Sequence, residues 1–528
     1  MTTATEIIKQ YVPEGSNPEI HGKTILFCVS REDVSAICVG LSETHGLPLK
    51  NMFASDDRAQ DDSFKIFYVF GVPKENYFLV PYIKLVGTTE FPSLATAVYA
   101  TCLYEAHIHE MFGLTPVGYP GLLQPNILHD NFPVGVYPMR KDFNKSELAD
   151  TKNKEHLSYK FFEVEGEGIY EVPVGPVHAG IIEPGHFRFS MAGEIIVNLE
   201  AKLGWMHKGS EKLFETLPLE KKLLLSERIA GDTSFAHSTA FAEAVEALAG
   251  IEASPRATYL RVVFGELERL ACHFNDIGFI LSDTGFNFGL ANGTRLRERI
   301  MQLNEKLTGS RFLRGVNVFG GVTKDISKTQ AEEILAEMSS LEKDFSEMIA
   351  VARGNSVILN RLEGSGRLTH QVALEHSAVG IPARAAGMAV DARADFPYAA
   401  YGKLALDVAV ETTGDVLGRY NVRISEVYSS MKLIRDALTQ IPSGAIVSAH
   451  GALTLKKNAT VVGIAEGWRG DVVYIVSTDS SGAISRVAVR DASFIGWNLI
   501  PHCAPGNVLL DFPLINKSFN LSYTGFDR

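Results

Sequence analysis

The sequence predicts an α+β protein in which a small N-terminal α+β domain precedes a larger, mainly helical domain with flanking β segments. The chain has 528 residues, enough for two or three domains and a large buried core. Hydrophobic residues make up 46% of it and charged residues 21%, which is typical of a globular protein. Strand-forming runs occur towards both ends of the chain, and helical periodicity dominates the middle.

The N-terminal part contains short runs rich in β-branched and aromatic residues. Such runs at 22–28, 66–72 and 77–86 are bounded by turn residues and predict strands. A helix is expected over 93–112, because the segment follows a proline and is stopped by Gly113. These elements predict a small α+β domain.

A polar stretch without periodicity separates the two predicted domains. Residues 144–158 read NKSELADTKNKEHLS, which is typical of a linker. We therefore expect a first domain at 1–145, a linker at 146–158 and a second domain at 159–528.

The second domain begins with strands, of which 194–199 is one, and then becomes helical. Apolar side chains recur at helical spacing over 260–277 and again over 334–349. Helices are expected to occupy most of 235–440, with loops between them. After residue 458 the sequence again favours strands.

Composition excludes several classes of protein. A net charge of −12 argues against nucleic-acid binding. The five cysteines form no CxxC pair, which argues against a zinc site, a cysteine-ligated iron–sulfur cluster and a disulfide framework, and favours a reducing compartment. Neither a signal peptide nor a long apolar run is visible, so we expect a cytoplasmic protein that meets the membrane only through partners. No nucleotide-binding glycine motif follows a predicted strand.

Two motifs in the first domain resemble a known family. LYEAHIHEMFGL at 103–114 and YPMRKDF at 137–143 resemble the 30-kDa subunit of respiratory complex I and its hydrogenase counterparts. The residues that match the family pattern are Glu105, Phe112, Gly113, Pro138, Arg140, Lys141 and Asp142.

The second domain carries a longer resemblance. Its motifs resemble the large subunit of group 4 nickel–iron hydrogenases and the related 49-kDa subunit of complex I. The order of the two resemblances is that of the fused subunits of formate hydrogenlyase and hydrogenase-4, and of fused C/D subunits of NADH-quinone oxidoreductase. The motifs include GPVHAGIIEPGHFRF at 175–189, LGWMHKGSEKLFE at 203–215, SERIAGDTSFAHSTAFAEAVEALAGIE at 226–252, EGWRGDVVY at 466–474 and DFPLINKSFNLSYTGFDR at 511–528.

The resemblance breaks down at the metal ligands. The family holds nickel and iron with four thiolates, two in R-x-C-G-x-C and two in D-P-C-x-x-C, because soft ligands suit these metals. Here the first motif starts at Arg228 and has Ala230 and Thr233 in the cysteine positions, and the second has Ser522 and Gly525. We call these five residues the vestigial pocket. We expect it to hold no nickel–iron centre, so the chain is not an autonomous hydrogenase.

The quinone site of complex I is the second precedent for this pocket. The family's quinone-binding tyrosine falls at Gly231 here, and its histidine falls near Pro184, flanked by His178 and His186. A quinone remains a possible ligand, but its usual hydrogen-bond donors are missing.

Polar residues remain around the vestigial pocket. Arg469 belongs to the family's E-x-x-R-G motif, and loss of an anionic metal centre leaves its guanidinium without a counter-charge. A buried unpaired charge is costly, so we expect Asp232 to pair with Arg469. Glu183 resembles the hydrogenase glutamate that passes protons. The catalytic candidates are Glu183, His178, His186, Asp232 and Arg469; alternatively, an Arg–Asp–Ser network merely satisfies buried polar groups.

Other positions bear on metal binding. Glu211 resembles the Mg²⁺-binding glutamate of hydrogenases, but Arg528 replaces its usual histidine partner. His107 and His109 lie two residues apart on a predicted helix, so they point to different sides, and we expect them to face the surface or a partner. Glu211 is the remaining metal candidate.

The resemblance implies the large subunit of a membrane-associated, complex I-like or hydrogenase-4-like oxidoreductase. Electrons would pass from an iron–sulfur small subunit to a quinone or another acceptor, with formate or NAD(P)H as the primary donor, and NAD binding is implied only by the family. Antiporter-like membrane-arm subunits would be further partners, and the complex would sit on the cytoplasmic face of the inner membrane. The alternative is a redox-inactive scaffold that couples partners in ion or inorganic-carbon transport.

Overall fold

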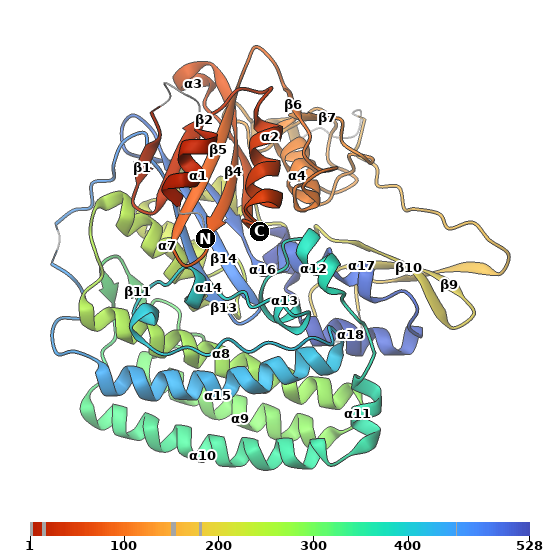
Figure 1. The fold of residues 1–528 in the computed structure, drawn as a ribbon, viewed down its shortest axis with the longest axis vertical. Coiled ribbons are helices and arrows are strands. Elements are labelled where there is room, and N and C mark those ends of the chain that lie inside the picture. The colour runs from red at the N-terminus through yellow and green to blue at the C-terminus, as the bar shows by residue number, and fades with distance from the viewer. Residues whose placement is uncertain (1–3, 13–16, 149–154, 179–181, 450) are drawn as a thin grey trace.

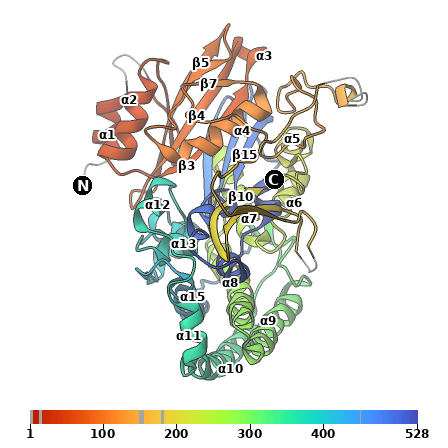
Figure 2. The same cartoon turned by 90° about the vertical axis from the view of Figure 1, so that its right-hand side faces the viewer.

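The computed structural model describes residues 4–12, 17–148, 155–178, 182–449 and 451–528. Figure 1 shows the N-terminal sheet at the top, a second sheet with short helices in the middle, and a bundle of long helices at the bottom. A hairpin projects to one side at the level of the middle layer, and Figure 2 shows the same layers from the side. The architecture is the mixed α+β class that the sequence predicts.

The N-terminal sheet contains the three strands predicted from the sequence. Its order is β1-β2-β5-β4-β3, with β2 parallel to β5 and the other neighbours antiparallel. The helices α1 and α2 cover one side of it (Figure 2). The bounds are α1 Ala4–Tyr11, β1 Glu19–His21, β2 Thr24–Cys28, α2 Val34–Val39, β3 Leu49–Asp56, α3 Arg58–Asp61, β4 Ser63–Val72, β5 Tyr77–Val86, β6 Glu90–Pro92, α4 Cys102–Phe112 and β7 Thr115–Val117.

The helix expected over 93–112 begins nine residues later than predicted, because α4 starts at Cys102. The buried carboxylate of Glu105 accepts hydrogen bonds from Ser93 Oγ at 2.5 Å and from the Leu94 amide at 2.7 Å. These bonds hold the segment after residue 92 as a loop against α4. A tertiary contact therefore overrides the local signal for a helix start.

The N-terminal sheet packs on a second, antiparallel sheet near the C-terminus, in the order β13-β14-β15. Phe67 and Val80 of the first sheet belong to the same buried hydrophobic cluster as Ile475 of the second. Beside this cluster, Lys50 Nζ lies 2.8 Å from Asp471 Oδ2, and both side chains are buried. The two predicted domains thus share a core. The bounds are β13 Thr460–Gly467, β14 Gly470–Thr478 and β15 Ile484–Arg490.

Helices occupy most of 235–440, as predicted, and a two-stranded ribbon and several loops interrupt them. The apolar stripe of α8 is buried between neighbouring helices, among them α9 and α15 (Figure 1). The bounds are α5 Ser210–Thr216, α6 Leu219–Ser226, α7 Ser234–Ala249, α8 Pro255–Asp283, α9 Asn287–Thr308, β11 Asn317–Val318, β12 Gly321–Val322, α10 Lys328–Arg353, α11 Ser356–Leu362, α12 His370–Glu375, α13 Gly380–Ala385, α14 Ala392–Asp395 and α15 Val416–Gln440.

The projecting hairpin and the C-terminal helices complete the fold. The strand predicted at 194–199 is β10, which pairs with β9, and β9 pairs with β8. Part of the predicted linker, 149–154, lies outside the described residues. Near the C-terminal end of the linker, the Leu157 amide donates a hydrogen bond to Phe132 O at 2.9 Å. The bounds are β8 Ile169–Val174, β9 His186–Ala192, β10 Ile195–Lys202, α16 Ala492–Gly496, α17 Ile500–Cys503, α18 Phe512–Phe519 and α19 Tyr523–Asp527.

Within the part of the chain that the structure describes, no helix combines the length and the apolar character needed to cross a lipid bilayer.

Candidate functional site

The four former ligand positions lie on two segments that meet in the middle layer. Ala230 and Thr233 are in the loop before α7, and Ser522 and Gly525 are at the start of α19. All four are buried. Thr524 Oγ1, between the last two, donates a hydrogen bond to Ile229 O at 3.2 Å and so joins the segments. The two motif segments therefore lie next to each other, with no cysteine at any of the four positions.

The residues at these positions have structural roles in the local backbone. Ser522 Oγ caps α19 by accepting a hydrogen bond from the Gly525 amide at 2.9 Å. A Cβ added at Gly525 would lie 2.6 Å from Asp491 Oδ1, closer than side chains normally approach. A cysteine at this position would therefore collide with Asp491. The residues present do not fit a nickel–iron centre.

Arg469 and Asp232 form the ion pair that the sequence predicts. Arg469 Nη1 and Nη2 donate to the two Asp232 carboxylate oxygens, each at 2.7 Å. Arg469 Nη1 also reaches Thr233 Oγ1 at 3.2 Å, and Nε donates to Asn520 O. The guanidinium lies over the Trp468 ring at 3.9 Å. The place beside the former metal site is thus filled by a bidentate pair.

The two partners of the pair differ in their exposure to solvent. The Arg469 side chain is 5% exposed, whereas that of Asp232 is 41% exposed. Burial opposes ionisation of Asp232, but the charge of Arg469 and its hydrogen bonds outweigh that effect and hold the pKa of Asp232 below its usual range. Asp232 is therefore ionised at neutral pH and faces the edge of the pocket.

A second buried network lies beside this pair. His237 shares hydrogen bonds with Tyr474 Oη and Asp491 Oδ2, both at 2.9 Å. With both ring nitrogens in hydrogen bonds, His237 is a core histidine whose polar groups are satisfied. Sequence reasoning missed Asp491, although an aspartate between a strand and Ala-Ser is a recognisable helix N-cap, and its Oδ1 accepts from the Ser493 amide at 2.7 Å. Asp491 brings this network next to Gly525, because a Cβ built there would lie 2.6 Å from Asp491 Oδ1.

Arg228 does not belong to the pocket, contrary to the prediction. Its side chain is 54% exposed and turns back to donate to Leu224 O. Arg228 occupies the arginine position of the motif, but the backbone of the loop directs its side chain towards solvent. Glu183, by contrast, reaches the C-terminal segment, where its Oε2 accepts from the Thr524 amide at 2.9 Å. Glu183 therefore lies next to the former ligand positions.

The two candidate histidines tie together the ends of the loop between β8 and β9. His178 Nε2 contacts Gly185 O at 2.8 Å, and His186 Nδ1 contacts Gly175 O at 3.3 Å. Both rings therefore use one nitrogen to hold the loop, and residues 179–181 of this loop lie outside the described part. Of the two histidines, His186 also lines a large cavity.

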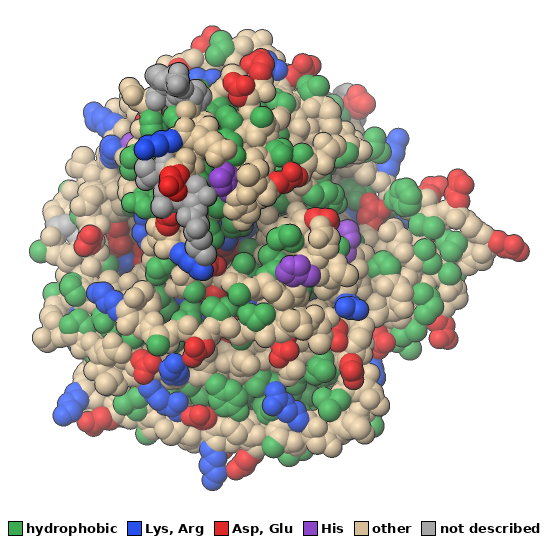
Figure 3. Space-filling view, viewed as in Figure 1, with side chains coloured by type: hydrophobic (Ala, Val, Ile, Leu, Met, Phe, Trp, Pro, Cys, Tyr) green, Lys and Arg blue, Asp and Glu red, His purple; other side chains and the backbone are tan. Residues whose placement is uncertain are grey.

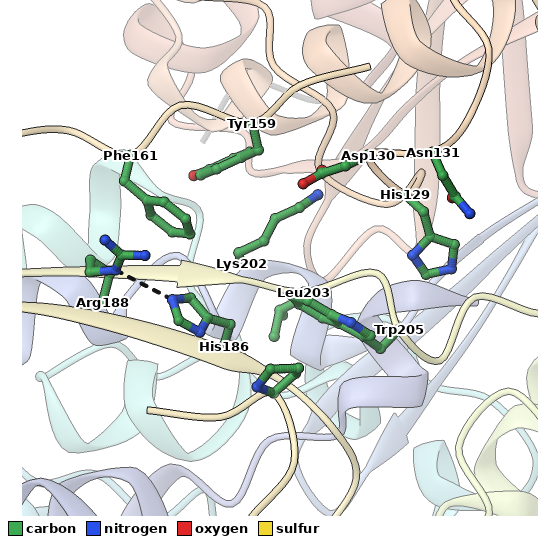
Figure 4. A pocket seen from close by; sticks show the side chains of 11 residues that line it. His129, Asp130, Asn131, Tyr159, Phe161, His186, Arg188, Lys202, Leu203 and Trp205 are labelled. Carbon is green, nitrogen blue, oxygen red and sulfur yellow. Dashed lines mark hydrogen bonds between the residues drawn. The ribbon is translucent and has the colours of Figure 1, made fainter. Parts of the chain in front are cut away.

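That cavity has a volume of about 600 Å³ and opens at the base of the β9–β10 hairpin (Figure 4). Aromatic side chains of Tyr159, Phe161 and Trp205 form part of its wall, together with the imidazole of His186 and the stem of Lys202. The rings of Phe161 and His186 lie 5.1 Å apart. The cavity thus combines flat apolar walls with hydrogen-bonding groups, as small-molecule sites do.

Lys202 is the buried cation of this cavity. Its ammonium donates to Asn126 O at 3.1 Å and to Pro125 O, and it lies 5.1 Å from the Tyr159 ring. Figure 4 shows its nitrogen directed towards Asp130. Burial lowers the pKa of Lys202 below its usual range. An ammonium has three N–H donors, so one remains for a ligand.

The vestigial pocket has a glycine, Gly231, where the resemblance places the quinone-binding tyrosine of complex I. A Cβ at Gly231, where the family's tyrosine would stand, meets Arg314 Nη2 at 3.1 Å. Arg314 Nη2 also donates to Gly231 O at 3.1 Å. A larger side chain at Gly231 would therefore displace this arginine. The pocket offers no replacement for that donor at this position.

Glu211 has arginine partners in place of a metal. Its Oε2 accepts from Arg486 at 2.9 Å, its Oε1 lies 3.4 Å from Arg528 Nη1, and the Val489 amide donates to Oε1 at 2.8 Å. Burial opposes ionisation, but the two guanidiniums lower the pKa of Glu211 below its usual range. Two cations already neutralise this carboxylate, so the Mg²⁺ candidate is not supported.

The neighbouring His107 is also placed differently from the prediction. Arg528 Nη2 lies 3.1 Å from His107 Nε2, and the ring packs against Phe494, so His107 faces the interior and not the surface. His109 has another partner, Leu114 O, at 3.1 Å. The two rings are separated as their spacing predicts. Among the described residues no cluster of three or more histidine, cysteine or acidic side chains is suited to a metal.

Comparison with known proteins agrees with this picture of a fused large subunit. The chain matches the respiratory-chain NADH dehydrogenase 30-kDa subunit over residues 27–148 and the 49-kDa subunit over 283–463. It is 32% identical to formate hydrogenlyase subunit 5 of Escherichia coli K12 over 484 residues, covering 91% of this chain and 84% of that protein. Hydrogenase-4 component G of the same organism is 31% identical, covering 90% and 83%.

More distant relatives extend the comparison. The fused C/D protein of the NADH-quinone oxidoreductase of Phocaeicola vulgatus is 30% identical and covers 74% of this chain and 77% of that protein. A component of an archaeal membrane-bound sulfane sulfur reductase superposes with a TM-score of 0.65 at 27% identity, covering 69% of this chain and 99% of that one. The chain belongs to the family of complex I-like and hydrogenase-4-like large subunits, in which 30-kDa and 49-kDa modules are fused.

Proposed function

We propose that this chain is the large subunit of a membrane-associated oxidoreductase complex that passes electrons from an iron–sulfur partner to a quinone or a related small acceptor. The observation that carries the proposal is the relation to formate hydrogenlyase subunit 5 and hydrogenase-4 component G over nine tenths of the chain. Relatives named as subunits of redox complexes favour this function over a redox-inactive scaffold for ion or inorganic-carbon transport.

The proposed partners are an iron–sulfur small subunit and antiporter-like membrane-arm subunits, which would hold the chain at the cytoplasmic face of the inner membrane. A structural neighbour is a component of a respiratory membrane complex, which supports assembly of this kind. Large apolar side chains are exposed around the β8–β10 hairpin, including Phe162 at 67%, Val177 at 86% and Ile182 at 55%. Exposed apolar surface of this sort is typical of a protein interface.

The acceptor site in this proposal is the cavity beside His186. In the vestigial pocket, Arg469 uses four of its five N–H groups on Asp232, Thr233 and Asn520, so we favour the cavity for the quinone. In the cavity, the remaining N–H of Lys202 Nζ can donate to a quinone carbonyl oxygen while Tyr159 stacks on the quinone ring. His186 forms part of the wall, because its Nδ1 contacts Gly175 O and its Nε2 accepts a hydrogen bond from Arg188 Nε at 3.5 Å. Reduction to the quinol consumes two electrons, supplied by the partner's cluster, and two protons from water.

Purification of the complex through a tag on this chain tests the proposal. Native membranes are solubilised in mild detergent, and the product is examined by mass spectrometry, iron analysis and reduction of a short-chain quinone. We expect an iron–sulfur protein and antiporter-like subunits to co-purify with donor-dependent quinone reduction. An assembled complex that contains no iron would favour the scaffold instead.

A variant of the cavity separates assembly from acceptor binding. Lys202→Met removes the ammonium but keeps the apolar stem, so the subunits should still co-purify while quinone reduction falls. Lys306→Met is the matched control, because the exposed Lys306 of α9 pairs with Glu333 of α10, and it should leave assembly and quinone reduction unchanged. Full quinone reduction by the Lys202→Met complex would exclude this cavity as the acceptor site.

A further inference from the structure

Two histidines lie close together in a part of the molecule that the redox proposal does not use. His376 follows α12, and His502 is in α17. Their Nε2 atoms are 3.1 Å apart, the ring centroids are 4.8 Å apart and the ring planes meet at 72°. The pair thus joins two segments that are 126 residues apart in the sequence.

The pair borders a cavity of about 270 Å³ between the 30-kDa-like and 49-kDa-like parts of the chain. Tyr99 and Cys102 of the N-terminal part line the same cavity. The Tyr99 ring packs edge-on against His376, with 4.6 Å between the centroids. His376 is buried and His502 is exposed, and Figure 3 shows histidine side chains at the surface in this region. Solvent and small ions therefore reach the pair from the His502 side.

The distance between the two nitrogens is that of a chelating pair. Two imidazole nitrogens that bind one ion at ~2.0–2.1 Å with a tetrahedral angle stand ~3.3 Å apart. If the two rings pointed at each other along one line, their centroids would lie farther apart than 4.8 Å, so the axes of the rings meet at an angle. A shared ion requires such a bend, and the cavity provides space for water molecules that complete its coordination.

A neutral imidazole ring carries one lone pair, on the nitrogen that has no proton. One explanation of the short distance is a hydrogen bond in which one ring donates its N–H to the other. The other explanation is that the two nitrogens are positioned to bind one metal ion together.

We propose that His376 and His502 form a two-histidine site for a late first-row divalent cation of the Zn²⁺ or Cu²⁺ class. Imidazole suits these ions, and an all-oxygen ion such as Mg²⁺ or Ca²⁺ has no suitable ligand in the pair. With two protein ligands, the site binds more weakly than a four-ligand structural zinc site. A bound ion links α12 to α17 beside the N-terminal part of the chain, so it stabilises the junction of the two parts.

Calorimetric titration of the untagged, chelator-treated chain with ZnCl₂ at pH 7.5 tests the proposal. We expect one Zn²⁺ per chain for the wild type. His376→Gln and His502→Gln should each bind at least tenfold more weakly. His370→Gln is the matched control, because His370 begins the same helix and its Nδ1 contacts Ala386 O at 2.8 Å, so its Zn²⁺ affinity should equal that of the wild type.

A second measurement identifies the ligands directly. One equivalent of Cu²⁺ should give an electron paramagnetic resonance spectrum with coupling to two imidazole nitrogens, reduced to one in His502→Gln. His502 is exposed, so this variant keeps the test valid even if His376→Gln fails to fold. Equal Zn²⁺ affinity in the wild type and His502→Gln, or no binding by the wild type at millimolar Zn²⁺, would overturn the proposal and leave a proton-sharing pair.

Discussion

Removal of the Asp232 carboxylate tests the replacement of the metal centre by an ion pair. Asp232→Ala leaves the Arg469 guanidinium, which is 5% exposed, with Asn520 O and Thr233 Oγ1 as polar partners. Breaking a buried ion pair from one side costs ~3–5 kcal/mol. Because Asp232 is 41% exposed, solvent screens part of this interaction, and we expect a loss of about 2 kcal/mol in the free energy of unfolding.

Urea denaturation followed by tryptophan fluorescence measures this loss. Trp468 reports on the region directly, because its Nε1 donates to Asp232 O at 3.2 Å and its ring lies under Arg469. Asp511→Ala is the control, since it removes the partner of Arg361, whose side chain is 40% exposed, and should cost ~0–1 kcal/mol. Equal losses in the two variants would refute the reasoning that a buried, uncompensated guanidinium dominates the energetics of the pocket.

Four further outcomes follow from the same geometry. The pKa of Asp232 is lowered in the folded chain, so ionised Asp232 stabilises the fold fully above its unfolded pKa of ~4, and this stabilisation is lost as the pH falls through the folded pKa. The urea midpoints of the wild type and Asp232→Asn should therefore converge at low pH; a difference between the midpoints that stays constant with pH would contradict this. Elemental analysis of the purified complex should find no stoichiometric nickel, because the four ligand positions carry no thiolate; near-equimolar nickel that survives chelation would disprove it. Glu211→Gln should destabilise the chain by about 3 kcal/mol, because Arg486 and Arg528 lose their shared counter-charge. Mg²⁺ should leave the melting temperature of the chelator-treated wild type unchanged; a melting temperature that Mg²⁺ raises in the wild type but not in Glu211→Gln would reinstate the metal site. Lys202→Arg should retain more quinone reduction than Lys202→Met, since it keeps a charged donor; identical rates would argue against hydrogen bonding by this side chain.

Elements with local causes were predictable from the sequence. The strands at 66–72 and 77–86 follow from their β-branched and aromatic composition, and α8 follows from its apolar stripe. The late start of α4 was not predictable, because Glu105 binds Ser93 and Leu94 across a loop. The packing of the N-terminal sheet on β13–β15 depends on contacts between residues hundreds of positions apart, which periodicity does not encode.

The candidate site divides in the same way. The pairing of Asp232 with Arg469 was predictable, because a buried guanidinium needs a counter-charge and the motif offers one carboxylate nearby. The direction of Arg228 was not, since a loop decides it. Asp491 was missed because its role depends on His237, which is 254 positions away. The need to balance a buried charge thus predicted the contacts of a side chain better than its position within a motif did.

At both places where the resemblance implies a metal, this chain has a carboxylate paired with arginine. Arg469 is held by Asp232 at one of them, and Glu211 is held by Arg486 and Arg528 at the other. A metal centre crosslinks distant segments and fixes their charge, and a buried arginine–carboxylate pair does both through directional hydrogen bonds. The Asp232–Arg469 pair joins segments 237 residues apart, and Arg469 also donates to Asn520 O, close to the second motif segment. These ion pairs hold the segments together in the structure, and under the proposed function we expect the acceptor in the cavity beside His186.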